Sequence, residues 1–485
     1  MLLLANKLLN SISMRRIAYA SPLNPIASGI SDYSEELLPY LGRYVDLTLY
    51  HDDGLRPSNP MLGQYCELRP ISRLERDQRR KRFDAIIYHM GNSAAHHAIW
   101  GTMQRVPGIV VLHEFVLHHF MLQYYATTLG DIERYQAEAA RRYGPEGEHI
   151  AKLMMHGRFV EAAFELPFCE DVLDRAQGLI AHSRYVLARA AAIRPTLAMG
   201  LAPMGVPLPP LINKAAARAR RGLAGDAPIL ASFGHINPYK RLEAALRAVR
   251  QLREPYPSLQ YLLVGSVSPH FQLQSLIERL GMQEYVHATG FVDRATFEEY
   301  VAATDICLNL RHPTAGETSA SLLRLLGAAR PSLVTASGAF SELPAGVAAQ
   351  VDPDASEGDL IHAYCRVLLD QPEMAQALGT AARCFVEQEH SLDASAAAYM
   401  RFLAQRYGWE APVAMRPRLW DPTPELAMPE AKPPQQLKHS QENAQADLPR
   451  SALTSNIAIA AAALGIAEHD PMLTQVAQAI ADIEG

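Results

Sequence analysis

The strongest constraint on the fold of this chain is a unit that occurs several times: a short apolar run, a loop with Gly or Pro, and an amphipathic helical segment. Residues 305–334 show it clearly, with an apolar strand expected at 306–310 and a helix that begins near Thr318 or Ser319, either of which can act as N-cap. Such a unit leaves free backbone N–H groups and the positive end of a helix dipole at the loop, where a phosphate binds well. Glu317 lies in the same loop, and its carboxylate can accept hydrogen bonds from sugar hydroxyls. Together these features indicate a site for a sugar diphosphate.

The same unit recurs in both halves of the chain, for example at residues 16–41 and 228–252. Alternating strands and helices of this kind indicate an α/β protein with parallel, doubly wound sheets. Residues 205–227 are rich in Pro and then in basic residues and show no strand pattern, so we place a domain boundary there. A chain of 485 residues is also too long for one ordinary domain. The predicted segments are an N-terminal extension (1–15), a first Rossmann-like domain (16–206), a linker (207–227), a second Rossmann-like domain (228–390), a closing helix (391–410), a disordered linker (411–452) and a C-terminal helical segment (453–485).

Composition and charge argue against several classes of protein. The formal charge of −6 is unlike that of a dedicated nucleic-acid binder, which is usually basic, so no nucleic-acid partner is expected. The five cysteines lie far apart without a CxxC pair, which argues against a metal site or a disulfide framework and favours a reducing cytoplasm. No run of about 18 apolar residues occurs, so no membrane-spanning helix is expected.

Three segments leave alternatives open. Residues 1–16 indicate an extension or a weak amphipathic helix rather than a signal peptide, with binding to a membrane surface as the alternative. Residues 73–82 hold six basic residues; a solvated helix face is the simplest interpretation, and contact with anionic lipid or a lipid diphosphate is the other. Residues 453–485 predict a helix pair broken at Asp470, which docks either on the body of the protein or on a partner protein.

Polar residues that could do chemistry lie where the predicted strands end, because ligands in open α/β sheets bind beyond the carboxyl ends of the strands. Lys240 and Arg241 follow Pro238 at the start of a helix, where two cations could neutralise a diphosphate; a solvated first-turn pair is the alternative. His113 follows a strand and either contacts substrate or is a satisfied structural histidine. Gly29 is best explained by a tight loop or by close approach of the backbone to a ligand.

No metal site is expected. His118 and His119 fall in a predicted helix, but no third ligand lies at a typical spacing from them. Asp352 and Asp354 match a DxD metal pattern, but a turn explains this pair of carboxylates more simply.

Several short motifs occur in a distinctive order along the chain. In the C-terminal half they are FGHINPYKR (233–241), LLVGS (262–266), TGFV (289–292) and RHPTAGETSASLLRLLGAARPSLV (311–334). With them, this half resembles the donor domain of a GT-B glycosyltransferase of the large retaining family 4, the glycosyl transferases group 1 domain. The N-terminal half is similar to the matching acceptor domain through SPLNPIASGISDYSEELLPYL, YHMGNS, VVLHEFVLHHF and LIAHSRYV. The resemblance covers roughly residues 16–407 and implies two doubly wound Rossmann-like domains that face a central cleft, followed here by a C-terminal helical tail.

The resemblance also implies roles for individual residues. Lys240 would hold the donor diphosphate, Glu317 would contact the sugar, and His113 would lie close to the transferred sugar. Further donor-binding residues that it implies are Gly29, Thr318 and Ser319 at the diphosphate, and Phe291 and Val292 at the base.

Two positions depart from the family pattern. Arg324 stands where a glutamate normally holds the ribose, and Glu317 is one residue out of register with that motif. His235 stands where an arginine usually precedes the lysine, and Arg241 would replace the lost charge. All three basic residues are still expected to bind the donor.

The activity that the resemblance implies is that of a hexosyltransferase-like enzyme. Such an enzyme moves a sugar from a UDP- or GDP-linked donor to a hydroxyl of a glycan or lipid-linked acceptor, with retention of configuration and without a metal or other cofactor. Bacterial polysaccharide biosynthesis, in the cytoplasm at the inner face of the membrane, is expected by association. The alternatives are a sugar-nucleotide epimerase of the same fold and a non-catalytic GT-B subunit whose tail recruits a transferase. A predicted helical insert at 131–177, suited to shaping an acceptor pocket, favours transfer over epimerisation.

Overall fold

The computed structural model describes residues 14–26, 28–80, 82–158, 161–269, 271–410 and 413–414. The chain divides into two compact units, Met1–Pro417 and Arg418–Gly485, and all described residues belong to the first. The predictions for the linker at 411–452, for the helical segment at 453–485 and for most of the extension at 1–15 therefore lie outside the described residues.

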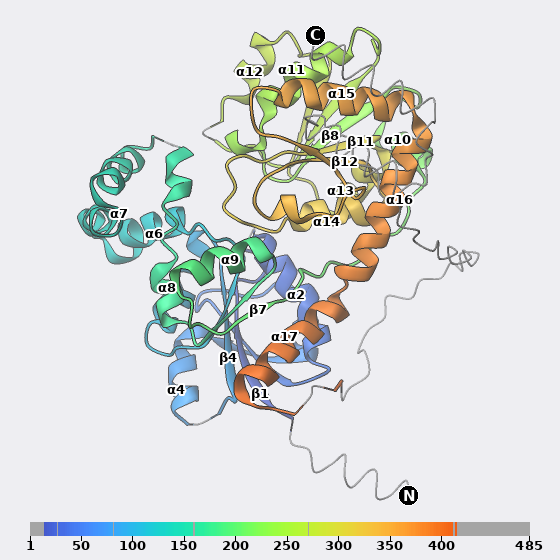
Figure 1. Ribbon diagram of the computed structural model, residues 1–485. Helices are drawn as coiled ribbons and strands as arrows, with labels where there is room; N and C mark the ends of the chain where they lie inside the picture. Colours follow the sequence, from blue (N-terminus) through green and yellow to red (C-terminus); the bar gives the residue numbers. More distant parts are fainter. Residues whose placement is uncertain are drawn as a thin grey trace, which may run out of the picture. The chain divides into compact units, whose positions relative to one another are not determined.

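The first sheet has seven parallel strands in the order β3-β2-β1-β4-β5-β6-β7 (Figure 1). Its inner strands are almost entirely buried, and their continuous apolar runs suit this position because a parallel strand is covered on both faces. The bounds are β1 (Arg16–Ala20), β2 (Asp46–His51), β3 (Cys66–Pro70), β4 (Ala85–Met90), β5 (Ile109–Leu112), β6 (Gly178–Ala181) and β7 (Met199–Leu201).

Alternate residues of these strands enter different cores, as the two-residue period of a strand requires. Ile17 and Tyr19 of β1 pack into a core with residues of α2 and α17, whereas Ala18 and Ala20 pack into the core on the other face. The helical elements connecting the strands are α2 (Gly29–Leu41), α3 (Leu62–Tyr65), η1 (Ile71–Arg73), α4 (Leu74–Arg79), η2 (Ala94–His96), α5 (His97–Met103), α6 (His118–Gln123), η3 (Tyr124–Leu129), α7 (Ile132–Met155), η4 (Glu161–Glu165), α8 (Glu170–Arg175) and α9 (Arg184–Ile193).

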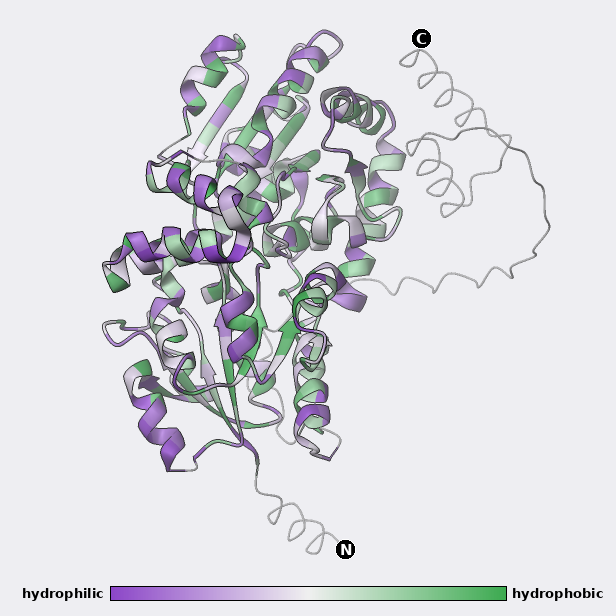
Figure 2. Ribbon diagram, turned by 60° about the vertical axis from the view of Figure 1, so that its left-hand side comes forward, coloured by the Kyte–Doolittle hydropathy of each residue, from purple (hydrophilic) through white to green (hydrophobic). Residues whose placement is uncertain are grey.

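The second sheet has six parallel strands in the order β10-β9-β8-β11-β12-β13. Figure 2 shows that its strands, like those of the first sheet, are largely hydrophobic, whereas the surrounding helices also carry hydrophilic residues. The strands are β8 (Ile229–Phe233), β9 (Gln260–Val264), β10 (Val286–Gly290), β11 (Ile306–Asn309), β12 (Ser332–Thr335) and β13 (Ala349–Val351). The helical elements are α10 (Lys214–Arg221), η5 (Pro238–Lys240), α11 (Leu242–Leu252), α12 (Leu273–Arg279), α13 (Arg294–Ala303), α14 (Ala320–Gly327), η6 (Gly338–Glu342), α15 (Glu357–Asp370), α16 (Pro372–Glu389) and α17 (Leu392–Tyr407).

The last helix, α17, returns to the first sheet (Figure 1). It packs against α2, β6 and β7, and the hydroxyl of Tyr33 in α2 lies 3.0 Å from the hydroxyl of Tyr399 in α17. The helix predicted at 391–410 is thus observed, with Ser391 as its N-cap. It connects the end of the chain's second half to the first sheet.

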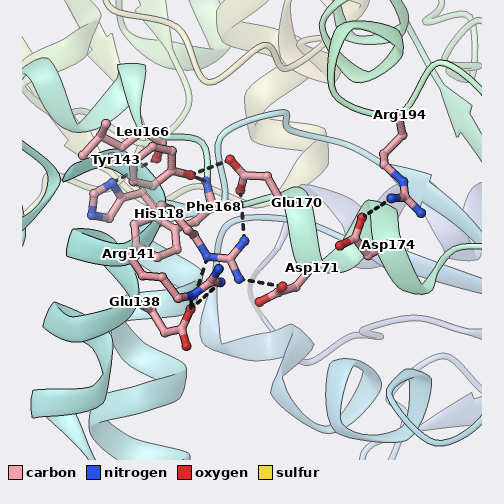
Figure 3. Close-up of polar contacts among 11 residues, drawn as sticks. His118, Glu138, Arg141, Tyr143, Leu166, Phe168, Glu170, Asp171, Asp174 and Arg194 are labelled. Carbon is pink, nitrogen blue, oxygen red and sulfur yellow. Dashed lines mark hydrogen bonds and ion pairs between the residues drawn. The ribbon is translucent and has the colours of Figure 1, made fainter.

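The helical insert between β5 and β6 is held by polar contacts (Figure 3). Tyr143 of α7 donates a hydrogen bond to Glu170 of α8 and accepts one from the backbone of Phe168. His118 in α6 contacts the carbonyl of Leu166 through Nδ1. These contacts join α7 to α8 and α6 to the segment before α8. The helices predicted within residues 131–177 are observed as α7, η4 and α8.

The predicted doubly wound α/β architecture with two sheets is confirmed. Ser319 is the N-cap of α14, and its side chain accepts a hydrogen bond from the backbone of Leu322, so one of the two caps proposed from the sequence is correct. Residues 207–227, predicted as a linker, contain helix α10, whose Arg218 pairs with Asp305 next to β11. In the described part of the chain, no helix combines the length and apolar character needed to cross a membrane.

Candidate active site

A cavity of about 720 Å³ lies between the two sheets, beyond the carboxyl ends of their strands. Ten of the eleven residues predicted for the site line it: Gly29, His113, His235, Lys240, Phe291, Val292, Glu317, Thr318, Ser319 and Arg324. Arg241 does not. Three residues that the sequence analysis did not single out, Asp32, Glu114 and Arg311, line the same cavity.

Direct contacts join the two sides of this cavity. The backbone N–H groups of Phe115 and Val116, after β5, both donate to the carbonyl of Ala315, at 2.7 and 3.0 Å. In addition, Arg324 of α14 donates to both carboxylate oxygens of Glu36 in α2, each at 2.9 Å. Specific bonds therefore join the two halves of the protein at both of these places.

Lys240 is held in the second-sheet wall by a short helical turn, η5, which Asn237 caps through a bond from the backbone of Tyr239. The side chain is buried, and Nζ donates a hydrogen bond to the carbonyl of Phe233. Burial, reinforced by the charge of Arg311 and opposed by that of Glu317, lowers the pKa of Lys240 to about 7. An anion bound in the cavity would favour the charged form of this lysine.

Glu317 lies in the loop between β11 and α14, where the sequence placed it. Its carboxylate forms an ion pair with Arg311 and accepts a hydrogen bond of 2.9 Å from the hydroxyl of Thr314. Arg311 lies two residues beyond β11 and donates through its backbone N–H to the hydroxyl of Thr335. The position of Arg311 just beyond a strand was the signal that could have identified it from the sequence.

The N-terminus of α14 opens onto the same cavity. Thr318, Ser319 and Ser321 line it, and Ser319 and Ser321 have their hydroxyls 3.0 Å apart. The first N–H groups of a helix have no partner within the helix, so this end offers donors and a positive dipole to an anion. Lys240 lines the same cavity, so a diphosphate there would meet both a cation and a helix end.

Arg241 is the predicted site residue that does not line the cavity. Its guanidinium donates to both oxygens of Glu357 in α15, from Nε at 3.0 and 2.9 Å and from Nη2 at 2.6 Å. The residue adopts a left-handed backbone conformation with φ of 52° between η5 and α11. Because its charge is paired with Glu357 and it does not line the cavity, the structure gives no support to the prediction that Arg241 neutralises a diphosphate, which stays a prediction. Arg311 is the arginine that accompanies Lys240.

The other end of the cavity is lined by Phe291, Val292, His235 and Arg324. The ring of Phe291 is 82% exposed, an unusual degree for a large apolar side chain. His235 shares a hydrogen bond of 2.9 Å with the hydroxyl of Ser266. One terminal nitrogen of Arg324, Nη1, is buried without a partner among the described residues, so it remains available to a ligand.

His113 belongs to a cluster of buried histidines on the first-sheet side. Its Nε2 lies 2.8 Å from Nδ1 of His89, and its ring centroid is 4.8 Å from that of His182. Burial, with the nearby His182 and His89, holds the pKa of His113 well below its usual value, so the ring is neutral near pH 7. Its Nδ1 has no partner among the described residues. His113 is thus both anchored within the protein and able to contact a ligand.

Gly29 begins α2, after the N-cap Ser28. A Cβ atom added at Gly29 would meet no other atom within 4 Å, and its φ is not among the positive values. The explanation by a tight loop is therefore wrong. Close approach of the backbone to a ligand stays a prediction.

Among the residues that the structure describes, no group of three or more His, Cys, Asp or Glu side chains is arranged to hold a metal ion. His118 is engaged by the carbonyl groups of Ala163 and Leu166 and by the hydroxyl of Tyr135. Asp354 accepts bonds from the backbone and the hydroxyl of Ser356, as expected for a turn.

Comparisons with known proteins agree with this geometry. Residues 213–343 match the family model described as "Glycosyl transferases group 1". The D-inositol 3-phosphate glycosyltransferase of Streptomyces griseus is 32% identical over 183 residues, which cover 35% of this chain and 38% of that protein. The chain thus matches less than half of the length of this relative.

Solved structures resemble a larger part of the chain. Sucrose-phosphate synthase from Thermosynechococcus elongatus has a TM-score of 0.59 and 17% identity, over 81% of this chain and 99% of that one. Anabaena HepE in complex with UDP has a TM-score of 0.55 and 15% identity, over 80% of this chain and 100% of that one. The protein therefore has the GT-B fold, and its residues 213–343 match the glycosyl transferases group 1 domain.

Proposed function

We propose that this protein is a retaining glycosyltransferase of family 4, which transfers a sugar from a nucleotide-sugar donor to a hydroxyl acceptor. The observation that carries the proposal is the cavity that brings Lys240, Glu317 and the N-terminus of α14 together, opposite Gly29 and His113. Basic, acidic and neutral polar groups in one cavity suit a ligand with a diphosphate at one end of a sugar.

The second-sheet side would bind the donor. Lys240 and the first N–H groups of α14 would neutralise the diphosphate as it leaves, which is where negative charge develops. Glu317, oriented by Arg311 and Thr314, would accept hydrogen bonds from the sugar. Phe291 offers an exposed ring on which a base can stack.

Retention, which rests on the resemblance to family 4, would follow from attack on the face that the diphosphate leaves. The bond from the sugar C1 to the diphosphate oxygen breaks, the acceptor oxygen forms the new bond to C1, and the acceptor proton passes to the leaving phosphate. Positioning and fixed charges supply the acceleration. The proposal assigns no step to a metal, so EDTA should leave the rate unchanged; loss of activity that Mg²⁺ restores would contradict this part.

We further propose a UDP- or GDP-linked donor and a glycan or lipid-linked acceptor, in bacterial polysaccharide biosynthesis at the inner face of the membrane. UDP is the first nucleotide to test, because HepE, which shares the fold, was solved with UDP. In the basic segment 73–82, Arg79 pairs with Glu75 and Arg82 with Glu67, so part of its charge is compensated within the protein. That favours the solvated-helix interpretation of this segment over contact with anionic lipid.

Thermal unfolding of the full chain with UDP, GDP, ADP and their common sugar conjugates tests the proposal. A ligand at 100 times its Kd stabilises the folded state by about 2.7 kcal/mol, which raises Tm by several degrees. The nucleotide that does so is then supplied as its sugar conjugate, and release of free sugar or transfer to an acceptor is measured.

Lys240→Ala should abolish the Tm shift, whereas Lys152→Ala, at an exposed lysine on α7, serves as the matched control. A nucleotide that stabilises the protein without any turnover would favour the non-catalytic subunit instead. If none of these nucleotides shifts Tm, the proposed function is wrong.

A further inference from the structure

Glu114 lies where the two walls of the cavity are tied together. The next two residues, Phe115 and Val116, donate their backbone N–H groups to the carbonyl of Ala315, in the loop that leads to Glu317, at 2.7 and 3.0 Å. Gly316 follows with φ of +86°, and a Cβ atom on it would come within 3.0 Å of Phe115. These contacts hold the loop that carries Glu114 next to the loop that carries Glu317, and both glutamates line the cavity.

Two cations that line the cavity are already engaged within the protein. Arg311 forms its ion pair with Glu317, and Nζ of Lys240 donates to the carbonyl of Phe233. Glu114 forms no ion pair among the described residues, and its protein partner is the backbone N–H of Asn92. Of the two glutamates, Glu317 therefore has a cation partner in the described part of the chain and Glu114 does not.

This arrangement determines which carboxyl group holds a proton. Burial, followed by the charge of Glu317, raises the pKa of Glu114 to about 7, although Arg311 and the Asn92 backbone act in the opposite direction. The titratable and charged groups that line the cavity with Glu114 are Asp32, neutral His113, His235, Lys240, Arg294, Arg311, Glu317 and Arg324, and His119 lies next to Asn92. A bound diphosphate would add negative charge and favour the protonated form further.

We propose that Glu114 is a positioning residue that contacts the transferred sugar as a neutral carboxylic acid and donates a hydrogen bond to one of its hydroxyl oxygens. This inference rests on the proposed function and adds a contact that determines sugar specificity. Ionised Glu317 can only accept hydrogen bonds, whereas a protonated carboxyl group also donates one. The two residues together would therefore recognise a pattern of hydroxyl groups, and a deoxy sugar that lacks the bonded hydroxyl leaves a polar group of the cavity unpaired.

The test compares Glu114→Gln and Glu114→Ala with the wild type, in full-length protein, by kcat/KM for the sugar nucleotide that the binding screen identifies. Glutamine keeps an N–H donor and cannot ionise, so it mimics the protonated acid. At pH 6.5 we expect Glu114→Gln to lose no more than about threefold and Glu114→Ala at least about tenfold. Between pH 7 and 9 the wild type should lose activity faster than Glu114→Gln, because only the wild type acquires a second negative charge facing Glu317.

Glu146→Gln, at an exposed glutamate on α7, is the matched control and should follow the wild type at every pH. If Glu114→Gln is as impaired as Glu114→Ala at pH 6.5, Glu114 acts as a carboxylate and the proposal fails. It also fails if wild type and Glu114→Gln lose activity in parallel from pH 7 to 9.

The protonation state is tested separately, without turnover, by Tm as a function of pH. A carboxyl group whose pKa is raised in the folded state stabilises the protein below its unfolded pKa, and that stabilisation is lost as pH rises through about 7. The wild type should therefore lose more Tm than Glu114→Gln between pH 5 and pH 7.5, and equal losses would refute a protonated Glu114. If this difference appears but no sugar nucleotide is turned over, the proposed function is wrong. The assignment of a protonated carboxyl group at Glu114 then still holds.

Discussion

The first-sheet side of the cavity is lined by His113, which burial keeps neutral, and by the carboxyl groups of Asp32 and Glu114, whereas the second-sheet side is lined by Lys240, three arginines and Glu317. His113 has its pKa held low by burial and by neighbouring histidines, and it bonds to His89. Lys240, Arg311 and Glu317 instead form a compact set of charges beside the N-terminus of α14. His113 thus offers hydrogen bonds that change little with pH, and the second-sheet side offers the cations.

This difference indicates how the site could divide its work. Fixed charge suits the diphosphate, whose interaction with cations strengthens as the bond to the sugar breaks. Neutral donors and acceptors suit sugar and acceptor hydroxyls, which carry no charge at any stage. Variants on the two walls should therefore differ both in the size of their effects and in their dependence on pH.

The largest effect is expected for Lys240→Ala. Removing the buried cation from the diphosphate site should lower kcat/KM for the sugar nucleotide by about 10²–10³, or about 2.7–4 kcal/mol of transition-state stabilisation. Steady-state kinetics with Lys240→Ala and the control Lys152→Ala measure it. A loss of less than threefold would mean that the charged wall does not hold the diphosphate.

The pH dependence of nucleotide binding should be the next largest effect. The pKa of Lys240 in the empty cavity is about 7, and a bound diphosphate favours the charged form, so binding at pH 8 must be accompanied by uptake of a proton. The affinity should fall by up to tenfold per pH unit above 7, and calorimetry in buffers of different ionisation enthalpy should detect the proton. In Lys240→Ala both the slope and the proton uptake above pH 7 should disappear.

His113→Ala tests the contribution of the neutral histidine on the first-sheet side of the cavity. Loss of one hydrogen bond to the sugar should cost about tenfold in kcat/KM, or about 1.4 kcal/mol. Because the ring is neutral near pH 7, the ratio of wild-type to variant activity should stay constant between pH 6.5 and 8. A ratio that changes across this range would show that His113 acts in its charged form, and the contrast between the two walls would fail.

The sequence pattern could predict the walls of the site but not every residue on them. Positions just after strands, such as His113 and Glu317, follow from the topology of a parallel sheet, and the helix after Glu317 follows from its cap and apolar spacing. The partner of Arg241 does not, because Glu357 lies 116 positions away and meets it only after the second sheet has formed. The position of Arg311 just beyond a strand could have drawn attention to it, but it did not exclude Arg241, which is also a basic residue beside a loop.

Glu114 is a second residue whose properties could not be predicted from the sequence. A glutamate after a strand and a histidine is an ordinary polar loop residue in the sequence. Its pKa is raised by burial and by the charge of Glu317, which lies some two hundred positions later in the chain. Neither cause can be predicted from local residue spacing. Local patterns therefore indicated which loops meet, and the tertiary structure determined which of their charges remain unpaired.

A smaller effect is expected where α2 meets α14. Arg324 donates to both oxygens of Glu36, and Arg294 of α13 pairs with the same carboxylate. Glu36→Gln and Arg324→Gln should each weaken nucleotide affinity three- to tenfold, since both groups help to hold the walls together. Measured together with the double variant, they should show a coupling of about 0.5–3 kcal/mol. Additive effects would mean that the pair does not contribute to binding as a unit.

The smallest effect on binding is expected for Arg241→Ala, although Arg241 is the immediate neighbour of Lys240. Its guanidinium is committed to Glu357, a buried carboxylate that would be left without its cation in the variant. Such a loss costs roughly 1–3 kcal/mol of folding stability, so Tm should fall while nucleotide affinity stays within twofold of the wild type. Glu357→Gln should reproduce part of the Tm loss, again without weakening binding. A tenfold loss of affinity in Arg241→Ala with unchanged Tm would place Arg241 in the charged wall after all, and the assignment of Arg311 as the partner of Lys240 would have to be withdrawn.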